Sequence, residues 1–382
     1  MKKIAVLRAN ALGDFIFILP ALQALRDSFP HAEITLLGKQ WHQSFLSGRP
    51  APVDRVIIVP PYPGVGEPED YRPDPAVNAA FFAAMVLENF DLAIQLHGGG
   101  RNSNPFVRRL GAKKTVGLKT PDAEALDVNI SYVYHFNETL RYLEVAAAAG
   151  ARPRSVVPRL DSIYSDLEEA AAALDNPDHL PLAVVHPGAT DIRRRWPAEK
   201  FAGIADELTA AGYLVCITGT PAETEVAAAV ARQASAPLRI RNLCGTISLG
   251  GLTGLLSMAA LMISNDTGPL HLARALDTPT IGLFWCINSI TGLSMVTDVH
   301  RTHVSWQFCC PVCGLSPKHF ASNPGGCMHQ TSFLTDITED EVRASVRELI
   351  AVLNSRTDVR RSERRMSDIN GNHESFSPHT DL

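Results

Sequence analysis

The sequence lacks a long apolar run. No stretch reaches the roughly 18 uncharged apolar residues of a membrane-spanning helix, and the four from Ile4 to Leu7 are too few for a secretory signal. Strong positive charge is also missing, since the net charge is −5 and the pI is near 6.2. This argues against a general nucleic-acid binder. These absences predict a cytoplasmic protein with no nucleic-acid partner.

The sequence also gives no sign of a disulfide framework or of the common dinucleotide-binding motif. The seven cysteines are an odd number in a chain without an export signal, which predicts reduced thiols or metal ligands rather than disulfides. The turn Arg8-Ala-Asn-Ala-Leu-Gly-Asp14 follows the first apolar run with one glycine, so the G-x-G-x-x-G dinucleotide motif is missing. The 382 residues, 46% of them hydrophobic, are nevertheless enough to fill two cores.

Short apolar runs alternate with helical patterns along most of the chain. Strands are expected at 4–7, 34–37, 56–59 and 92–96, and again at 182–185, 214–217, 261–265 and 280–281. Such alternation predicts parallel sheets, and hence an α/β fold of two halves with a cleft between them. Residues 60–75 are too rich in proline and glycine for regular structure. Asn176-Pro177-Asp178 places the domain boundary near residue 178.

The most informative stretch is Leu261–Leu283, which predicts a strand, a turn, a helix and a second strand. Asp266 or Thr267 is expected to cap the helix, and Gly268 leaves room for something to approach the backbone closely. The free N–H groups of such a helix start form an anion site, toward which His271 could point. The alternative is that Asp266 only caps and that His271 is a satisfied interior histidine.

Two further loops follow expected strands. Of the three consecutive arginines 193–195, one or two could point into the cleft, where their planar forks suit phosphate. The alternative is a basic surface corner. Gly98-Gly99-Gly100, followed by Arg101 and Asn102, is either a backbone contact site at a strand end or only a flexible turn.

Near the end of the second half lies a group of potential metal ligands. Cys310 and Cys313 form a C-x-x-C pair, and Cys327 and His329 follow. This order of residues resembles zinc-ligand spacing. The alternative is a set of reduced structural thiols.

Together these residues resemble glycosyltransferase family 9, the ADP-heptose:lipopolysaccharide heptosyltransferases. The resemblance covers most of residues 1–353. It is carried by Leu12-Gly13-Asp14 with Leu19-Pro20-Ala21-Leu22, His186-Pro187-Gly188-Ala189 with Arg195-Trp196-Pro197, Gly219-Thr220-Pro221-Ala222-Glu223, Cys244-Gly245-Thr246-Ile247-Ser248-Leu249, and Asn265-Asp266-Thr267-Gly268-Pro269-Leu270-His271-Leu272-Ala273.

The resemblance implies a glycosyltransferase B type fold, in which two Rossmann-like domains face a central cleft. The N-terminal domain, 1–178, would hold the acceptor, and the C-terminal domain, 179–335, would hold the nucleotide-sugar. A terminal helix at 336–355 would pack back on the N-terminal domain. Residues 356–382 are polar and rich in arginine, and we expect them to form a disordered tail.

Position by position, Asp14 matches the family's general base. Arg194 stands where the family usually has a lysine, and Glu223 matches a ribose contact for which Glu225 is a possible substitute. The implied donor residues are Arg194, Asp266, Thr267, Gly268, His271 and Glu223, and the acceptor-side candidates are Gly13, Gly99, Arg101 and Asn102. Because a Cys-bearing segment is common in these enzymes, we expect no metal or other cofactor, and Cys310, Cys313, Cys327 and His329 are the candidates if a metal is bound.

The implied reaction is inverting, metal-independent transfer of a heptose or related sugar. The donor would be an ADP-sugar, and the acceptor a lipopolysaccharide core or similar lipid-linked glycan at the inner face of the plasma membrane. A nucleotide diphosphate leaves readily, so one base suffices, whereas glycoside hydrolysis needs two carboxylates. We expect domain closure to bring Asp14 to the sugar carbon. The alternatives are a nucleotide-sugar epimerase of the same fold and a non-catalytic nucleotide- or carbohydrate-binding protein.

Overall fold

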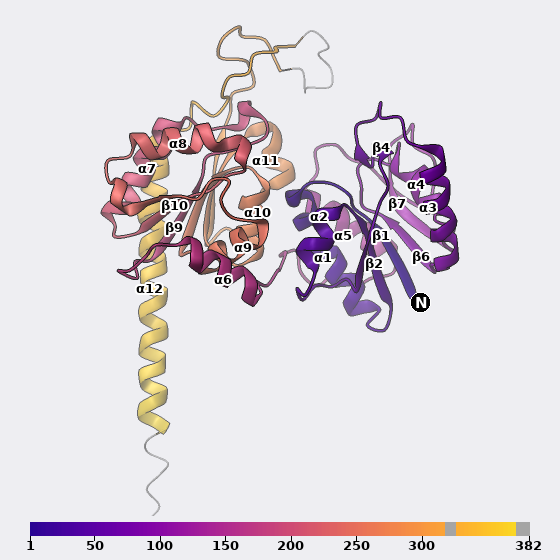
Figure 1. The fold of residues 1–382 in the computed structure, drawn as a ribbon, viewed down its shortest axis with the longest axis horizontal. Helices are drawn as coiled ribbons and strands as arrows, with labels where there is room; N and C mark the ends of the chain where they lie inside the picture. Colours follow the sequence, from indigo (N-terminus) through magenta and orange to yellow (C-terminus); the bar gives the residue numbers. More distant parts are fainter. Residues whose placement is uncertain (318–325, 372–382) are drawn as a thin grey trace, which may run out of the picture.

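Two α/β units lie side by side in the computed structural model, which describes residues 1–317 and 326–371 (Figure 1). The sheet of the N-terminal unit has the strand order β3-β2-β1-β6-β7-β8, and that of the C-terminal unit β11-β10-β9-β12-β13-β14. Every pairing in both sheets is parallel. Numbered within its own sheet, each unit has the order 3-2-1-4-5-6 of a doubly wound Rossmann fold.

Each of the eight expected runs forms a strand, whereas the strands at 128–131, 240–242 and 300–305 were not expected. The first sheet contains β1 (Lys3–Leu7), β2 (Glu33–Gly38), β3 (Arg55–Ile58), β6 (Leu92–Gln95), β7 (Thr115–Lys119) and β8 (Val128–Ser131). The second contains β9 (Leu182–His186), β10 (Leu214–Ile217), β11 (Ile240–Asn242), β12 (Leu261–Asn265), β13 (Thr280–Trp285) and β14 (His300–Ser305). Residues 60–74, within the segment 60–75 that was expected to be irregular, hold only the two-residue strands β4 (Tyr62–Pro63) and β5 (Gly66–Glu67), and Pro75 begins the next helix.

Helices cover both faces of each sheet. In the N-terminal part of the chain they are α1 (Leu12–Ser28), α2 (Gln40–Leu46), α3 (Pro75–Glu88), α4 (Ser103–Arg108), α5 (Glu138–Ala148) and α6 (Tyr164–Ala173). In the C-terminal part they are α7 (Ala198–Ala210), α8 (Thr224–Gln233), α9 (Leu249–Met258), α10 (Gly268–Ala275), α11 (Cys286–Gly292) and α12 (Glu339–Gly371). Three short 3₁₀ turns complete the described structure: Ile192–Arg194, Pro221–Glu223 and Pro237–Arg239.

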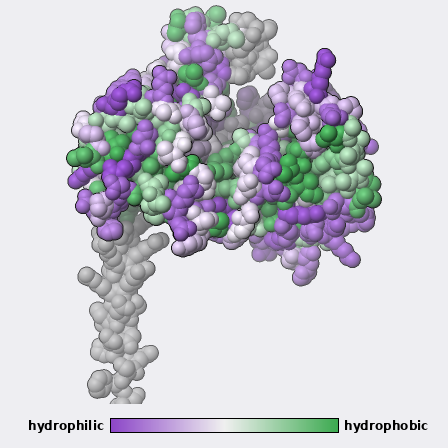
Figure 2. Space-filling model, in the orientation of Figure 1, coloured by the Kyte–Doolittle hydropathy of each residue, from purple (hydrophilic) through white to green (hydrophobic). Residues whose placement is uncertain are grey.

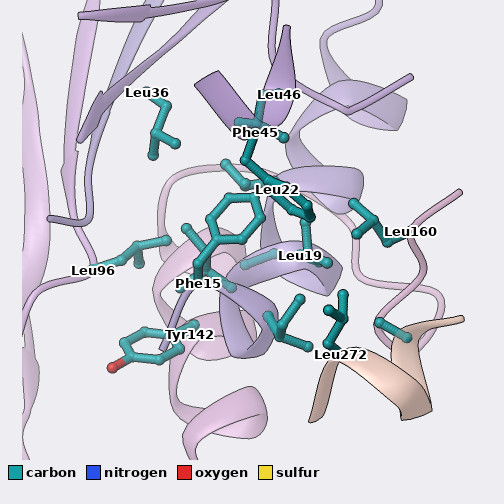
Figure 3. Packing of buried hydrophobic residues seen from close by; sticks show 14 of the residues in the cluster. Phe15, Leu19, Leu22, Leu36, Phe45, Leu46, Leu96, Tyr142, Leu160 and Leu272 are labelled. Atoms are coloured by element: carbon teal, nitrogen blue, oxygen red, sulfur yellow. The ribbon is translucent and has the colours of Figure 1, made fainter. Parts of the chain in front are cut away.

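Helix α1 is the centre of the N-terminal core and also faces the C-terminal unit. Its apolar side chains recur three or four residues apart, and Phe15, Leu19 and Leu22 are buried. The helix continues through Pro20. Leu272 of α10 packs into the same cluster (Figure 3). The core is therefore continuous between the two units, although Figure 2 shows a hollow between them at one end.

The structure corrects the expectation for the terminal helix. The apolar face of α12 packs on α7 and β13 of the C-terminal unit, where Val342, Val346 and Leu349 are buried, and not on the N-terminal unit. An amphipathic pattern shows that a face is buried but does not identify what covers it. Neither α12 nor any other helix in the described ranges combines the length and apolar content needed to cross a membrane.

Two other boundaries also differ from expectation. Helix α12 continues to Gly371, so residues 356–371 of the expected disordered tail are helical, while 372–382 lie outside the described residues. No glycine or proline interrupts the chain between residues 356 and 370, which explains why the helix can continue. Helix α6 packs along α9 of the C-terminal unit. By packing, the connection between the units therefore lies at 149–163, before α6, rather than near 178.

Candidate active site

The candidate site lies where the two sheets reverse their strand order. Such switch points open a crevice beyond the carboxyl ends of the strands, and doubly wound folds bind ligands there. In the first sheet the switch lies between β1 and β6, and in the second between β9 and β12. The loop after β1 leads into α1, and the loop after β12 leads into α10. These two helix starts contain the catalytic and phosphate-binding candidates.

Asp14 lies in the first turn of α1 and is held by Arg8, the residue that follows β1. The buried guanidinium of Arg8 donates from Nη2 to Asp14 Oδ1 at 2.8 Å. The backbone N–H of Ala11 donates to Asp14 Oδ2 at 3.2 Å. The side chain of Asp14 is still 37% exposed, whereas that of Arg8 is 2% exposed. The carboxylate is therefore fixed in orientation and open to a ligand.

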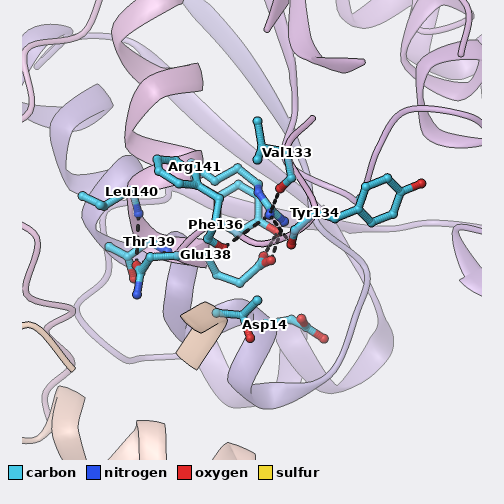
Figure 4. Close-up of polar contacts among 12 residues, drawn as sticks. Asp14, Val133, Tyr134, Phe136, Glu138, Thr139, Leu140 and Arg141 are labelled. Atoms are coloured by element: carbon cyan, nitrogen blue, oxygen red, sulfur yellow. Dashed lines mark hydrogen bonds and ion pairs between the residues drawn. The ribbon is translucent and has the colours of Figure 1, made fainter. Parts of the chain in front are cut away.

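Glu138, at the start of α5, belongs to the same network. Tyr142 donates its hydroxyl to Glu138 and accepts a hydrogen bond from Arg8 Nη1 at 2.6 Å. Burial raises the pKa of Tyr142 above its ordinary value, so the hydroxyl keeps its proton. Arg141 Nη1 contacts the other oxygen of Glu138 at 2.5 Å, and Asp14 lies beside this group (Figure 4). One chain of hydrogen bonds thus positions two carboxylates.

The start of α10 has the geometry expected of an anion site. Thr267 is the N-cap residue, and its extended backbone leads into the helix that begins at Gly268. Pro269 lies in the first turn, as expected. The first N–H groups of a helix have no partner within it and lie at the positive end of its dipole. Because Pro269 has no N–H and the N–H of Leu270 donates to the Thr267 carbonyl at 3.1 Å, the N–H of Gly268 remains to donate to a phosphate oxygen.

Asp266 contacts two other side chains of the site, His271 and Arg194. Its Oδ1 lies 3.1 Å from His271 Nε2, and its Oδ2 lies 3.5 Å from Arg194 Nη1. Burial lowers the pKa of His271 below its ordinary value, although Asp266 acts in the opposite direction. The neutral ring then donates from Nε2, because a carboxylate can only accept. Asp266 thus orients both a neutral imidazole and a guanidinium at the anion site.

Two glycines allow the helix starts of the two units to touch. A Cβ atom on Gly268 would lie 3.0 Å from Leu12 Cβ and 3.1 Å from the backbone nitrogen of Gly13. A Cβ atom on Gly13 would lie 3.3 Å from His271 Cδ2. These spacings leave almost no room for a side chain at either position. The contact brings Asp14, in the next position of α1, to the edge of the anion site.

Two connected pockets meet at this contact. The larger has about 1150 Å³ of empty space and is lined by the loops after β9, β10 and β11 and by the starts of α1 and α10. The second, with about 830 Å³, is lined by Asp14, Glu138, Arg194, Asp266 and His271. The first residues of α1 and α10 line both pockets. Asp14 and the anion turn already share one pocket in this structure.

Glu223 lies deep in the larger pocket. Its Oε2 accepts hydrogen bonds from the backbone N–H of Thr220 at 2.8 Å and from the Thr220 hydroxyl at 2.9 Å. A Cβ atom on Gly188 would lie 2.2 Å from the Glu223 carboxyl group, so a larger residue there would displace that carboxylate. Glu225, the suggested substitute, is exposed and is not among the lining residues. Glu223 is therefore the better placed of the two.

The structure does not bring three of the acceptor-side candidates to the site. The carbonyl of Gly99 accepts from Thr120, Arg101 lies 3.6 Å from Asp122, and Asn102 donates to Glu69 at 3.3 Å. None of these three candidates lines the two pockets, because the loop after β6 turns toward its own unit. Gly13, the fourth candidate, lines both.

Sequence reasoning missed the residues that support Asp14. Arg8 directly follows a buried strand, and a charged residue in that position is a signal that could have identified it. Glu138 and Tyr142 lie in α5, for which the sequence predicted no functional role. Thr190, which lines both pockets beside Arg194, also carried no signal of its own.

Comparisons with known proteins agree with this geometry. The sequence profile of glycosyltransferase family 9 (heptosyltransferase) matches residues 79–289, more than half of the chain. The lipopolysaccharide heptosyltransferase 1 of Pseudomonas aeruginosa is 26% identical over 323 residues, covering 81% of this chain and 86% of that protein. The lipooligosaccharide heptosyltransferase 2 of Haemophilus ducreyi is 24% identical over 294 residues, covering 72% and 81%.

Solved structures show the same architecture. The Escherichia coli ADP-heptose LPS heptosyltransferase II superimposes with a TM-score of 0.69 at 18% identity, covering 92% of this chain and 99% of that one. E. coli WaaC with ADP-2-deoxy-2-fluoro heptose gives 0.60 at 21% identity, covering 79% and 92%. At these identities the likeness establishes the fold. The predicted glycosyltransferase B type fold of two Rossmann-like units is confirmed.

Proposed function

This chain belongs to glycosyltransferase family 9 (heptosyltransferase), and on that premise we propose that it moves a heptose or related sugar from an ADP-sugar to a lipopolysaccharide-core glycan with inversion. The observation that carries the proposal is the shared pocket of Asp14 and the α10 start. One unit contributes a fixed, accessible carboxylate, and the other contributes backbone N–H groups and an arginine. An inverting transfer needs these groups on opposite sides of the sugar carbon.

In the proposed reaction the ADP moiety lies in the larger pocket, with its diphosphate at Thr267 and Gly268. The acceptor hydroxyl oxygen attacks the anomeric carbon and gives its proton to Asp14. The bond from that carbon to the phosphate oxygen breaks, and the electron pair leaves with ADP. Arg194 and the helix N–H groups stabilise the charge that develops on the phosphate.

Exposure favours Asp14 over Glu138 as the base. The Glu138 side chain is 16% exposed and already binds Arg141 and the Tyr142 hydroxyl, whereas the Asp14 side chain is 37% exposed. A base must reach the proton that it removes, so the more open carboxylate is the better candidate. We assign Glu138 a positioning role, in which it holds Tyr142 and through it Arg8.

The relatives named for lipopolysaccharide and lipooligosaccharide heptosyl transfer support a lipid-linked glycan as the acceptor. With such an acceptor the enzyme would work in peripheral contact with the inner face of the plasma membrane, in the cytoplasm. No metal or other cofactor takes part in the proposed chemical step, because the charge on the leaving phosphate is met by Arg194 and backbone dipoles.

The test is an ADP-release assay with ADP-heptose and a heptose-deficient lipopolysaccharide core as acceptor. We expect ADP release only when both substrates are present, and NMR of the product should show the anomeric configuration opposite to that of the donor. Consumption of ADP-heptose without acceptor would favour the epimerase alternative. ADP binding without turnover on any core acceptor would favour the non-catalytic alternative. A product that retains the donor configuration would overturn the inverting mechanism.

A further inference from the structure

The segment after β14 extends from the C-terminal unit as a protrusion (Figures 1 and 2). It contains Cys310, Cys313, Cys327 and His329, whose potential ligand atoms all lie within 4.8 Å of one another. The Cys327 Sγ and Cys310 Sγ atoms lie 3.1 Å and 3.8 Å from His329 Nδ1. All seven cysteines of the chain are free, so no disulfide explains the convergence.

The backbone is arranged around the sulfur atoms. Val312 N–H points to Cys310 Sγ at 3.4 Å, and His329 N–H points to Cys327 Sγ at 3.2 Å. Gly314, with φ +71°, closes the Cys-Pro-Val-Cys-Gly turn by donating its N–H to the Cys310 carbonyl at 2.8 Å. Hydrogen bonds of this kind orient thiolate ligands and stabilise their charge.

Among the described residues of the protrusion, Cys310 and Cys327 are buried in the core cluster of the C-terminal unit, whereas several larger apolar side chains are exposed. Four of its large apolar side chains are more than half exposed: Phe308 (53%), Val312 (62%), Leu315 (53%) and Met328 (66%). The two chain segments that carry the cysteines meet at the ligand cluster and at an isolated β-bridge between Pro317 and Cys327. With several of its described apolar side chains exposed, this segment would gain conformational stability from a cross-link at the ligand cluster.

We propose that Cys310, Cys313, Cys327 and His329 bind one divalent transition-metal ion, Zn²⁺ or Fe²⁺, in a closed tetrahedral site. With metal–ligand bonds of about 2.0 to 2.3 Å, tetrahedral ligands lie roughly 3.3 to 3.8 Å apart. The observed separations, from 3.1 Å to no more than 4.8 Å, need only a small contraction. Three thiolates and one imidazole select a thiophilic ion over Mg²⁺ or Ca²⁺.

The site is structural, because the protein supplies all four ligands and leaves no open position for a substrate. None of the four ligands lines the two pockets of the candidate active site. The metal site nevertheless lies close in sequence to residues that hydrogen-bond the loop of arginines 193–195. Just beyond His329, Phe333 N–H donates to the Arg193 carbonyl at 2.8 Å, and the Ser332 hydroxyl donates to the Arg195 carbonyl at 2.6 Å.

Arg194, the proposed phosphate ligand, lies between the two residues that this segment supports. The ring of Phe333 also packs on Trp285 at the end of β13, with 4.4 Å between centroids. The metal therefore fixes the start of the segment that positions Arg194. This last consequence rests on the proposed function, whereas metal binding itself does not.

The test begins with metal analysis by mass spectrometry of the full-length protein, purified without chelator. We expect roughly one equivalent of zinc or iron per chain, and the element found identifies the ion. Replacing it with Co²⁺ in the otherwise unaltered protein should give an intense thiolate-to-cobalt absorption band. Less than a tenth of an equivalent after incubation with Zn²⁺ or anaerobic Fe²⁺, together with no cobalt band, would overturn the proposal.

Variants identify the ligands. Cys313→Ser and His329→Gln should each lose most of the bound metal, whereas Cys309→Ser, an exposed neighbour outside the cluster, should retain it. Full metal content in the Cys313→Ser/His329→Gln double variant would contradict the assignment. The Co²⁺ measurement needs no variant, so a variant that fails to fold does not weaken the test.

The supporting role is measured separately by titrating the metal-free and metal-loaded protein with ADP. We expect removal of the metal to weaken ADP binding about tenfold, and unchanged affinity would overturn that role. Metal content is measured without nucleotide or sugar, so failure of the proposed sugar transfer is distinguishable from failure of the metal site.

Discussion

The two units of this chain have the same strand order but place different chemistry at their switch points. In the N-terminal unit a buried arginine directly follows β1 and holds Asp14 at the start of α1. In the C-terminal unit, a turn of small residues ends β12 and presents backbone N–H groups at the start of α10. One unit therefore offers a proton acceptor, and the other offers an anion site.

The difference shows that the fold determines where a ligand binds and the residues at the strand ends determine what happens to it. Gly13 and Gly268 allow the two helix starts to come into contact, so the carboxylate of one unit lies beside the anion site of the other. A chain with two anion turns would only bind nucleotide. A chain with two carboxylate turns would repel it.

The largest effect is expected from removing the carboxylate that the N-terminal unit contributes. Asp14→Asn should lower kcat by about 10² to 10⁴, because the proposed general base is lost. ADP affinity should stay within about twofold, because the proposed diphosphate site lies on the other unit. ADP-release kinetics and calorimetry measure the two quantities. The control is Asp27→Asn, an exposed position on the same helix that should change neither.

Glu138→Gln sharpens the same assignment. We expect a smaller loss of kcat than in Asp14→Asn, because the amide still accepts the Tyr142 hydrogen bond that holds Arg8. If Glu138→Gln abolishes turnover while Asp14→Asn retains it, the roles of the two carboxylates are reversed.

The next largest effect is expected from removing the arginine that the C-terminal unit contributes to the anion site. Arg194→Ala should weaken ADP binding roughly 10- to 100-fold, because a charge-assisted contact to phosphate is lost. Calorimetric titration measures this directly. Arg232→Ala, an exposed arginine on α8 of the same unit, is the control and should bind ADP as before. Unchanged affinity in Arg194→Ala would show that the α10 turn binds the diphosphate without the arginine.

The pH dependence of unfolding stability can be compared between the two units, because each contains a buried histidine with a lowered pKa. Burial lowers the pKa of His97 to about 3 and that of His300 to about 4. Below the unfolded value of 6.5 only the unfolded chain takes up these protons, so stability falls as pH drops from 6.5 toward those values. Each histidine contributes a slope of about 1.4 kcal/mol per pH unit.

Urea unfolding between pH 7 and 5 measures that slope. His97→Gln and His300→Gln should each flatten it, whatever their effect at pH 7. His31→Gln, at an exposed position, should leave the slope unchanged. A slope that is the same in all three variants would contradict the role of burial.

The smallest effect concerns the nucleoside end of the C-terminal pocket. Glu223→Gln should weaken ADP binding about three- to tenfold, because one hydrogen bond to a charged acceptor is lost. Glu225→Gln, two residues away and exposed, should bind ADP normally. The opposite ranking in calorimetry would return the ribose contact to Glu225.

Local patterns predicted much of this molecule. Thr267 and Gly268 were identifiable because strand, turn and helix follow within one short stretch, and the alternating apolar runs predicted both parallel sheets. Contacts between distant residues were not predictable in this way. Arg8 meets Tyr142 across 134 positions, and nothing near either residue indicates the other. The Gly13–Gly268 contact depends on how two separately folded units meet.

The terminal helix illustrates the same limit. Its apolar face was evident from Val342, Val346 and Leu349, but the surface that covers it depends on the tertiary fold, and the structure places that surface on the C-terminal unit. The four metal-ligand candidates are close in sequence. Their convergence, however, depends on the turn at Gly314 and on the bridge between Pro317 and Cys327, which spacing alone did not establish.

The most direct test of the divided site is a crystal structure of the protein with ADP. The account predicts the diphosphate at the N-terminus of α10, within hydrogen-bond distance of the Thr267 or Gly268 N–H groups and of Arg194. The ribose should lie toward Glu223, with the Asp14 carboxylate facing the terminal phosphate across the Gly13–Gly268 contact. A diphosphate bound instead at Gly98–Gly100 of the N-terminal unit would contradict the division of labour between the two units.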